Sequence, residues 1–310
     1  MQHTNIAIGV DIGGGHIVCS AVDMASGQPI SDTSSSRKVN SKGTCEEILD
    51  CWAGCINLTL EKIDTSQLIG FGFAIPGPFN YQTGVAIYEQ TDKYENLYNV
   101  SIKEALNPLL NVEQAHMRFL NDASAFAVGT TWCGQAMGTK KSISLTLGTG
   151  FGSAFIDDDI PVVNRRDVPD QGCLWHLPFG DGIADDYFST RWFVNRYREL
   201  TGISVQGVKE VAEAARENTA AMNIFLEFVD NLSGFLMPWL KCFGPEVVVM
   251  GGNIMGAGDI FLEELKGLIS CEVPVDIVIS ELMEEAAMIG SARLFDEDYW
   301  KKIRPHLPTI

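Results

Sequence analysis

Two stretches of the chain pair a tight glycine turn with apolar runs on both sides: GVDIGGGHIVCSAVD at residues 9–23 and SLTLGTGFGSAFIDDD at residues 144–159. A glycine-rich turn between two strands lets several backbone N–H groups point at one anion, because no side chain blocks close approach. Each turn alone is also typical of an ordinary hairpin. Two turns in matched contexts favour a polyphosphate held from both sides. The turn residues are Gly13, Gly14 and Gly15 in the first stretch and Gly148, Thr149 and Gly150 in the second.

Asp11 stands just before the first turn. Its carboxylate is expected where a hydrated Mg²⁺ that bridges phosphates needs an oxygen partner, so we expect contact with the metal through water. The chain contains no G-x-x-x-x-G-K-[ST] motif, and strands rather than helices follow both turns. These features argue against a Walker-type NTPase and against a dinucleotide site.

A second acid, Asp122, follows Asn121 in the motif NDAS. A carboxylate at the end of a strand, next to an amide, can orient a substrate hydroxyl and accept its proton as a bond to phosphate forms. The alternative is purely structural, because Asn-Asp before a helix is a common N-cap for a segment such as 123–133. Both interpretations stay open at this point.

The elements that must position these residues alternate between strand and helix. The two halves each open with a strand, a glycine turn and a second strand, which predicts a duplicated unit whose turns face each other across a cleft. The pattern predicts strands at 5–10, 16–23, 29–39, 68–75, 117–122 and 246–254, and helices at 45–63, 101–110, 123–133, within 181–242 and at 284–296.

Composition limits the classes of function. A chain of 310 residues with 46% hydrophobic side chains can form two lobes. The net charge of −18, from 40 acidic and 22 basic residues, argues against nucleic acid as a partner. It permits a nucleotide held with a divalent cation, since the ion and backbone N–H groups offset the phosphate charge locally.

The sequence also bears on the compartment. We expect no membrane partner and a cytoplasmic location, because no apolar run approaches about 18 residues and the first residues lack a secretion signal. The 8 cysteines are scattered without a C-x-x-C pair, which favours reduced thiols over a disulfide framework.

Five blocks of the sequence resemble the sugar kinases of the ROK family (repressors, open reading frames and kinases), in the family's order and at about its intervals. The blocks are GVDIGGGHIVCSAVD, IPGPFN, NDASAFAVGT, LTLGTGFGSAF and EVVVMGGNIMGAG, and the resemblance covers roughly residues 5–295. The family belongs to the actin, hexokinase and Hsp70 superfamily. The resemblance therefore implies an α/β fold of two ribonuclease-H-like (actin-like ATPase) domains that flank a nucleotide and sugar cleft. The implied boundaries are 1–120, joined by a C-terminal helix at 293–310, and 121–292.

The resemblance also implies roles for individual residues. Asp122 matches the family's catalytic base, and the cofactors implied are ATP and Mg²⁺. The glycine turns match the two phosphate turns, and Gly251 and Gly252 lie in the adenosine turn. The residues implied to contact a small-molecule sugar are Gly77, Asn121, Asp122, His176 and Asp185.

Partners follow from the same resemblance. The family's repressors carry a helix-turn-helix extension before the first phosphate strand, where this chain has about 4 residues, so no nucleic acid partner is expected. Dimerisation is a habit of the family, and the resemblance therefore allows a homodimer.

The chain departs from the family at several positions. Gly15 stands where the family usually has Thr, and His16 stands where it often has Lys. In the family's E-x-G-H motif, Cys173 replaces the Glu and Trp175 replaces the Gly, while His176 is kept. The three-cysteine cluster that usually follows is absent. A structural zinc site needs about four N or S ligands, so we expect no zinc.

The departures leave two hypotheses. The first is an ATP-dependent kinase for a hexose, with glucose, an N-acetylated hexosamine and fructose among the candidate sugars. The second is a non-catalytic sugar or nucleotide sensor with the same fold. Turnover discriminates between them, because a kinase consumes ATP only when its sugar is present and a sensor binds without consuming ATP.

The polar and aromatic segment at residues 88–98 is either a substrate loop or an exposed linker.

Overall fold

The computed structural model describes residues 5–308, and contacts among them divide the chain into two compact units. The first unit comprises the chain up to Met137, the segment Asp159–Pro161 and the chain from Glu284 onward. The second comprises Gly138–Asp158 and Val162–Met283. The sequence predicts divisions after residues 120 and 292 instead. The difference arises because helix α3 (Asp122–Cys133) packs on α9 (Glu285–Ala292), so both helices belong to the first unit.

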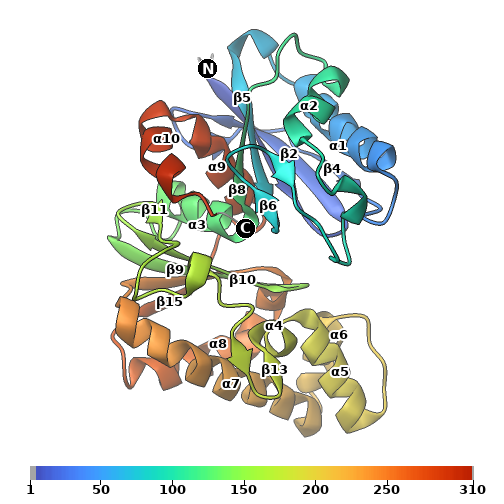
Figure 1. The fold of residues 1–310 in the computed structure, drawn as a ribbon. Coiled ribbons are helices and arrows are strands. Elements are labelled where there is room, and N and C mark those ends of the chain that lie inside the picture. Colours follow the sequence, from blue (N-terminus) through green and yellow to red (C-terminus); the bar gives the residue numbers. More distant parts are fainter. Residues whose placement is uncertain (1–4, 309–310) are drawn as a thin grey trace. The chain divides into compact units, whose positions relative to one another are not determined.

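A mixed sheet forms the core of the first unit (Figure 1). Its strand order is β3-β2-β1-β5-β8, and β4 also pairs with β2. Strands β1 and β2 are antiparallel, whereas β1, β5 and β8 are parallel, so the three end at the same edge of the sheet. The strands are β1 (Ile6–Ile12), β2 (His16–Asp23), β3 (Gln28–Pro29), β4 (Ser35–Lys38), β5 (Leu68–Ile75) and β8 (Met117–Asn121).

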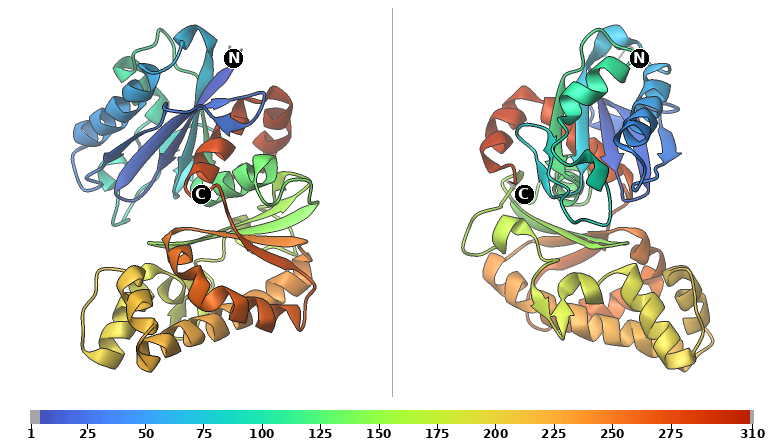
Figure 2. Two further views of the ribbon diagram at one scale, coloured as in Figure 1. Left: turned by 180° about the vertical axis from the view of Figure 1, so that it is seen from behind. Right: turned by 45° about the vertical axis from the view of Figure 1, so that its right-hand side comes forward.

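Helices cover both faces of this sheet (Figure 2). A Cβ on Gly9 would overlap the backbone of Met288 in α9, whereas Cys19, paired with Val10, contacts Cys55 in α1. Because successive side chains of a strand point to opposite faces, α9 and α1 pack on opposite sides. The remaining elements of this unit are α1 (Cys45–Leu60), α2 (Ile102–Leu106), α10 (Glu297–Ile303), β6 (Phe79–Asn80), β7 (Val85–Ala86) and β11 (Ile160–Pro161).

Helix α1 begins where its sequence predicts. Thr44 accepts a hydrogen bond from the N–H of Glu47, and the Glu47 carboxylate accepts one from the N–H of Thr44, which completes a capping box. Helix α9 approaches the sheet closely because glycines line the contact. A Cβ on Gly72 of β5 would overlap the carbonyl of Ser291. These positions need glycine for packing.

The second unit repeats the strand pattern of the first. Strands β9 and β10 are antiparallel, β9 and β14 are parallel, and β14 is parallel to β15. In both units, the first strand of a hairpin thus also pairs in parallel with a strand that comes later in the chain. The bounds are β9 (Lys141–Leu147), β10 (Phe151–Asp157), β12 (Pro178–Phe179), β13 (Gly182–Ile183), β14 (Val247–Gly251) and β15 (Asp276–Ile279).

The helices of the second unit pack on its sheet around an aromatic core. Phe188, Phe193, Phe225 and Phe228 are fully buried there, and Phe193 and Phe228 lie 4.9 Å apart between ring centroids. Burying aromatic rings supplies much of the apolar area that stabilises such a unit. The helices are α4 (Ala184–Tyr187), α5 (Thr190–Thr201), α6 (Val208–Ala215), α7 (Thr219–Phe243) and α8 (Gly258–Ser270).

The predicted α/β class and the duplicated strand-turn-strand unit are confirmed. The predicted strand at 29–39 is wrong as one element, because Asp32 adopts a left-handed backbone (φ 64°) between the short strands β3 and β4. No disulfide joins the cysteines, all of which lie within the described residues. Across residues 5–308, none of the helices combines the length and apolar character that crossing a membrane requires.

Candidate active site

The first unit gathers its predicted site residues at one edge of its sheet. Asp11 in β1 is in register with Ala74 in β5, and Ile75 is in register with Asn121 in β8. Asp122 follows at once as the first residue of α3. The carboxyl ends of neighbouring parallel strands are a common place for ligand sites in α/β sheets.

Asp122 is held by its neighbours in sequence. Its Oδ1 accepts hydrogen bonds from the Ala123 N–H at 2.8 Å and from Asn121 Nδ2 at 3.0 Å. Burial raises the pKa of the carboxyl, and these hydrogen bonds and the charge of Lys93 oppose the rise. A carboxylate that is desolvated yet oriented suits general base chemistry.

Asn121 serves the helix as well as the carboxylate. Its Oδ1 accepts a hydrogen bond from the Ser124 N–H at 3.1 Å, so it is the N-cap of α3. The structural interpretation of Asn121 is therefore confirmed. It is compatible with a site role, because the cap fixes the amide whose Nδ2 reaches Asp122.

Asp11 lies in an acidic environment. Burial, followed by the negative charges of Asp122 and Glu284, raises the pKa of Asp11 to about 7. Three carboxylates close enough to influence one another are a setting that a divalent cation relieves. The described residues hold no cluster of three or more His, Cys, Asp or Glu side chains placed to bind a metal. A Mg²⁺ at Asp11 would thus depend on water and phosphate oxygens, as this ion commonly does.

The first glycine turn is a tight hairpin between β1 and β2. The Gly13 N–H donates to the His16 carbonyl at 2.9 Å. None of the three glycines has a positive φ. A Cβ on Gly13 would stand 2.9 Å from His16 Nδ1, and one on Gly14 would overlap Nζ of Lys93, whereas a Cβ on Gly15 would meet no described atom within 4 Å. At Gly15, neither conformation nor packing within the described chain accounts for glycine.

The second glycine turn lies between β9 and β10. The Gly148 N–H donates to the Gly150 carbonyl at 3.0 Å, and the Gly148 carbonyl accepts from the Thr190 N–H at 2.8 Å. The Phe151 N–H donates to Asp185 Oδ1 at 2.7 Å. This turn is therefore held by α5 and by the carboxylate of Asp185.

The Asp185 carboxylate contacts the second glycine turn and Arg191. Its Oδ2 lies 3.0 Å from Nη2 of Arg191, so both carboxylate oxygens have partners in the second unit. The sequence predicts a sugar contact for Asp185, and its contacts instead support the glycine turn. The sugar role stays a prediction. Sequence reasoning missed Arg191, whose only signal was its spacing of six residues from Asp185.

The predicted adenosine turn follows β14. Gly252 has a positive φ of 89°, and a Cβ there would overlap the Leu147 carbonyl at the end of β9. Packing thus requires glycine at this position. The nearby Thr190 Oγ1 donates to Asn253 Oδ1 at 3.3 Å, which links this turn to α5.

His176 lies within the second unit, half-buried beside Trp175. Their ring centroids are 5.3 Å apart in an edge-on arrangement, and Trp175 is 47% exposed. The Trp175 carbonyl accepts a hydrogen bond from the Asp185 N–H at 3.0 Å. Trp175 and His176 therefore lie next to Asp185, the residue whose carboxylate supports the second glycine turn. Cys173 donates to the Gln171 carbonyl at 3.5 Å.

Sequence reasoning also missed three tyrosines that close around the first unit's site. The hydroxyls of Tyr81, Tyr88 and Tyr94 donate to the carbonyls of Ile75, Pro76 and Gly13 at 3.1, 2.9 and 2.6 Å. All three side chains are buried. The segment 88–98 is therefore no exposed linker at Tyr88 and Tyr94, although Tyr98 at its end is 42% exposed. The repeated tyrosines in an otherwise polar stretch were the signal.

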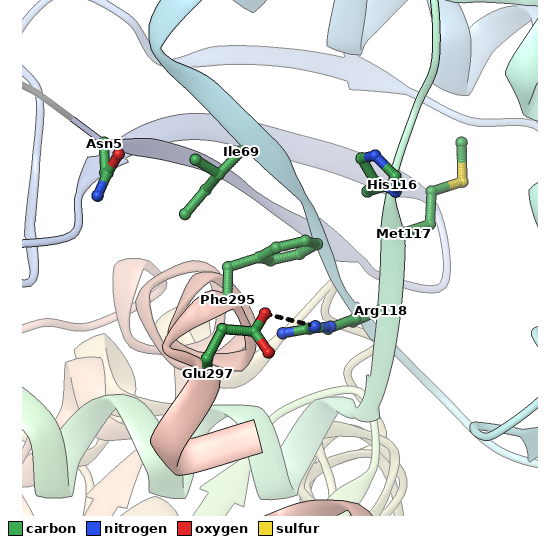
Figure 3. A pocket seen from close by; sticks show the side chains of 7 residues that line it. All are labelled: Asn5, Ile69, His116, Met117, Arg118, Phe295 and Glu297. Atoms are coloured by element: carbon green, nitrogen blue, oxygen red, sulfur yellow. Dashed lines mark hydrogen bonds and ion pairs between the residues drawn. The ribbon is translucent and has the colours of Figure 1, made fainter. Parts of the chain in front are cut away.

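A cavity of about 560 Å³ lies elsewhere in the first unit (Figure 3). It borders the start of β5 and β8, at the sheet edge opposite Asp122. Its Arg118 is paired with Glu297 at 2.7 Å and lies over the ring of Phe295 at 4.8 Å. Because its cation is already neutralised, this cavity is not a candidate phosphate site.

Comparison with known proteins finds a matching family and several relatives of this chain. The model of the ROK family matches residues 7–166, slightly more than half of the chain. The glucokinase of Thermotoga maritima is 24% identical over 273 residues, which cover 77% of this chain and 82% of that protein. The N-acetyl-D-glucosamine kinase of Haemophilus influenzae is 25% identical over 267 residues, covering 79% and 83%. The xylose repressor of Caldicellulosiruptor bescii is 22% identical over 260 residues, covering 74% and 63%.

The fold has solved counterparts. A crystal structure of a ROK family glucokinase from Streptomyces griseus, in complex with glucose and AMPPNP, matches with a TM-score of 0.75 and 23% identity, covering 94% of this chain and 100% of that chain. The fold is thus the actin-like ATPase fold of the ROK kinases. Since the family model covers over half of the chain and the strand pattern agrees, the protein belongs to the ROK family.

Proposed function

We propose that the protein is an ATP-dependent sugar kinase that transfers the γ-phosphoryl group to a hydroxyl of a hexose or N-acetylhexosamine. A glucokinase and an N-acetyl-D-glucosamine kinase among its relatives support this proposal. The observation that carries it is the Asp122 carboxylate, which is half-buried and held by hydrogen bonds at the end of β8. Asp11, at the same edge of the sheet, is close enough for its pKa to respond to the charge of Asp122.

Asp122 is the proposed base. Its two hydrogen bonds end on Oδ1, so Oδ2 is the oxygen proposed to accept the proton of the sugar hydroxyl. The hydroxyl oxygen forms a bond to the γ-phosphorus, the bond from that phosphorus to the bridging oxygen of ADP breaks, and the proton passes to Asp122. A raised pKa makes the carboxylate a stronger base, because it binds the incoming proton more tightly.

Asp11 and the first turn are proposed to hold the phosphates. Magnesium, when bound near Asp11 through water, would offset negative charge on the phosphate oxygens. The space beside Gly15 is open, which leaves room for a phosphate next to the backbone of this turn. We place no zinc in this account.

The remaining predicted residues are proposed as follows. In the second unit, the turn Gly148–Gly150 binds phosphate through the N–H groups of Thr149 and Gly150, while the Gly148 N–H shapes the turn and Asp185 supports it. Gly251 and Gly252 bind the adenosine, and His176 donates to a sugar hydroxyl. In the first unit, Gly77 and the amide of Asn121 contact the sugar.

The test is Mg²⁺-dependent release of ADP from ATP with a panel of hexoses and N-acetylhexosamines. The proposal predicts turnover with at least one sugar. Replacing Asp122 by Asn keeps the shape of the side chain but removes the base, so we expect kcat to fall by about 10² to 10⁴-fold. Asp50→Asn, an exposed position in α1, is the matched control and should retain wild-type turnover.

Two outcomes contradict the proposal. Binding of ATP or sugar without any sugar-dependent turnover would assign the protein to non-catalytic sensors. Turnover that survives Asp122→Asn within about tenfold would leave the kinase class intact but remove Asp122 as its base.

A further inference from the structure

The side chain of Lys93 lies against the first glycine turn, although 79 positions separate it from Gly14. A Cβ built on Gly14 would overlap its Nζ and stand 2.8 Å from its Cε. The ammonium group therefore occupies the space directly over the backbone of Gly14. The turn's own residues, Gly13 to His16, include no lysine or arginine.

The residue that follows Lys93 fixes this placement. The Tyr94 hydroxyl donates to the Gly13 carbonyl at 2.6 Å, and the Tyr94 N–H donates to the Ser41 carbonyl at 2.8 Å. The ring of Tyr94 packs against Trp52 with 5.4 Å between centroids and is 1% exposed. Tyr94 also takes a left-handed backbone (φ 61°), a conformation that a non-glycine residue adopts at some cost. These contacts anchor the segment beside the turn, so Lys93 is positioned rather than merely near.

Lys93 forms no ion pair with another side chain in the part of the chain that the structure describes. Its positive charge nonetheless reaches Asp122, where it lowers the pKa of a carboxyl that burial raises. With Asp11 and Glu284 also close to this edge, a phosphate that enters meets three negative groups and one ammonium.

We propose that Lys93 is a further catalytic residue, whose ammonium group binds a terminal phosphate oxygen of the nucleotide held at the first glycine turn. This inference rests on the proposed kinase function and names the side-chain cation for that site. As the γ-phosphoryl group moves to the sugar oxygen, negative charge spreads over the phosphate oxygens, and an ammonium already in place stabilises that charge without reorganisation. Lysine is suited to this role as a point charge on a flexible stem.

The experiment compares wild type with Lys93→Met, Lys93→Arg and Lys301→Met. Lys301 is an exposed lysine of α10 and serves as the matched control. Calorimetry measures the affinity for Mg-AMPPNP, for adenosine and for the sugar, and steady-state kinetics measure kcat with ATP. Thermal unfolding checks that each variant is folded.

The expected result separates charge from structure. In Lys93→Met, Mg-AMPPNP should bind about tenfold more weakly or worse, and kcat should fall by about 10²-fold, as when one donor to a developing oxyanion is removed. Adenosine and sugar affinities should stay at wild-type values, because neither ligand carries the phosphate. Lys93→Arg should recover most of both losses, and Lys301→Met should match wild type.

Three results would overturn the inference. In the first, Lys93→Met matches wild type in Mg-AMPPNP affinity and in kcat, while wild-type turnover leaves the kinase function standing. In the second, adenosine and sugar binding weaken as much as Mg-AMPPNP binding, which indicates a structural role. In the third, wild type binds no Mg-AMPPNP. If wild type instead binds Mg-AMPPNP but turns over no sugar, the kinase proposal fails alone, and the affinity ratio still tests the phosphate contact.

Discussion

At the scale of single residues, the first unit's site depends on groups that also serve the fold. Asn121 caps α3 through Oδ1 and orients Asp122 through Nδ2, so one amide supports a helix and a carboxylate. Gly15 is the opposite case. Its φ is not positive, and no described atom would contact a Cβ there. Nothing in the described chain fills this space, and we expect the phosphates of the nucleotide to use it.

Gly15→Ala tests that reasoning. The free energy of unfolding should stay within about 0.5 kcal/mol of wild type, because an exposed surface substitution without strain costs little. The kcat/KM for ATP should fall by about tenfold or more, since a displaced phosphate is poorly aligned. Urea unfolding and steady-state kinetics measure the two quantities.

Gly267→Ala in α8 is the control, since a Cβ there also meets open space and the position lies far along the chain from either turn. It should leave kcat/KM unchanged. Equal kcat/KM in Gly15→Ala and wild type would show that the space over Gly15 is not used by the nucleotide.

At the scale of elements, the segment between β5 and β8 is the feature that completes the first unit's site. It contains only the short strands β6 and β7, the helix α2 and brief 3₁₀ turns. Yet Tyr81, Tyr88 and Tyr94 are buried, and their hydroxyls donate to the end of β5, to Pro76 and to the glycine turn. The Tyr94 hydroxyl is a protonated donor to Gly13 at neutral pH, and burial raises its pKa above the ordinary value. Side-chain donors thus fix a loop that has little regular structure of its own.

Tyr94→Phe removes that donor and keeps the ring. We expect the free energy of unfolding to fall by about 1 kcal/mol, because the half-buried Gly13 carbonyl loses the hydrogen bond from Tyr94. The KM for ATP should also rise, since Lys93 and the turn lose a common anchor. Tyr98→Phe, at a ring that is 42% exposed, is the matched control for both measurements. Identical stability and KM in the two variants would refute a positioning role for the Tyr94 hydroxyl.

Local patterns account for much of what the sequence predicted. The strand-turn-strand units, the start of α1 and the cap at Asn121 each depend on residues close together in the chain, so periodicity and side-chain chemistry identified them. The partners of Asp185 and Tyr94 were not predictable in this way. Phe151 lies 34 residues from Asp185, and Gly13 lies 81 residues from Tyr94. Such contacts arise only when packing brings distant segments together.

At the scale of the whole molecule, a net charge of −18 works against binding a polyanion, so local groups must offset it. Each unit has a glycine turn, and the first adds Lys93 and the carboxylate of Asp11, which we propose as the partner of a hydrated Mg²⁺. The same charge disfavours a nucleic acid partner, even though a xylose repressor is among the relatives. Membership in the ROK family alone does not separate a kinase from a repressor, and only chemistry does.

The most direct measurement of that chemistry is transfer of label from [γ-³²P]ATP to sugar by the 310-residue chain, with Mg²⁺ present. We expect a hexose or N-acetylhexosamine to become labelled in proportion to the ADP formed, and the rate of labelling to fall by about 10² to 10⁴-fold in Asp122→Asn. Label that stays on ATP with every sugar, or that appears only as inorganic phosphate, would contradict the claim that this protein is a sugar kinase.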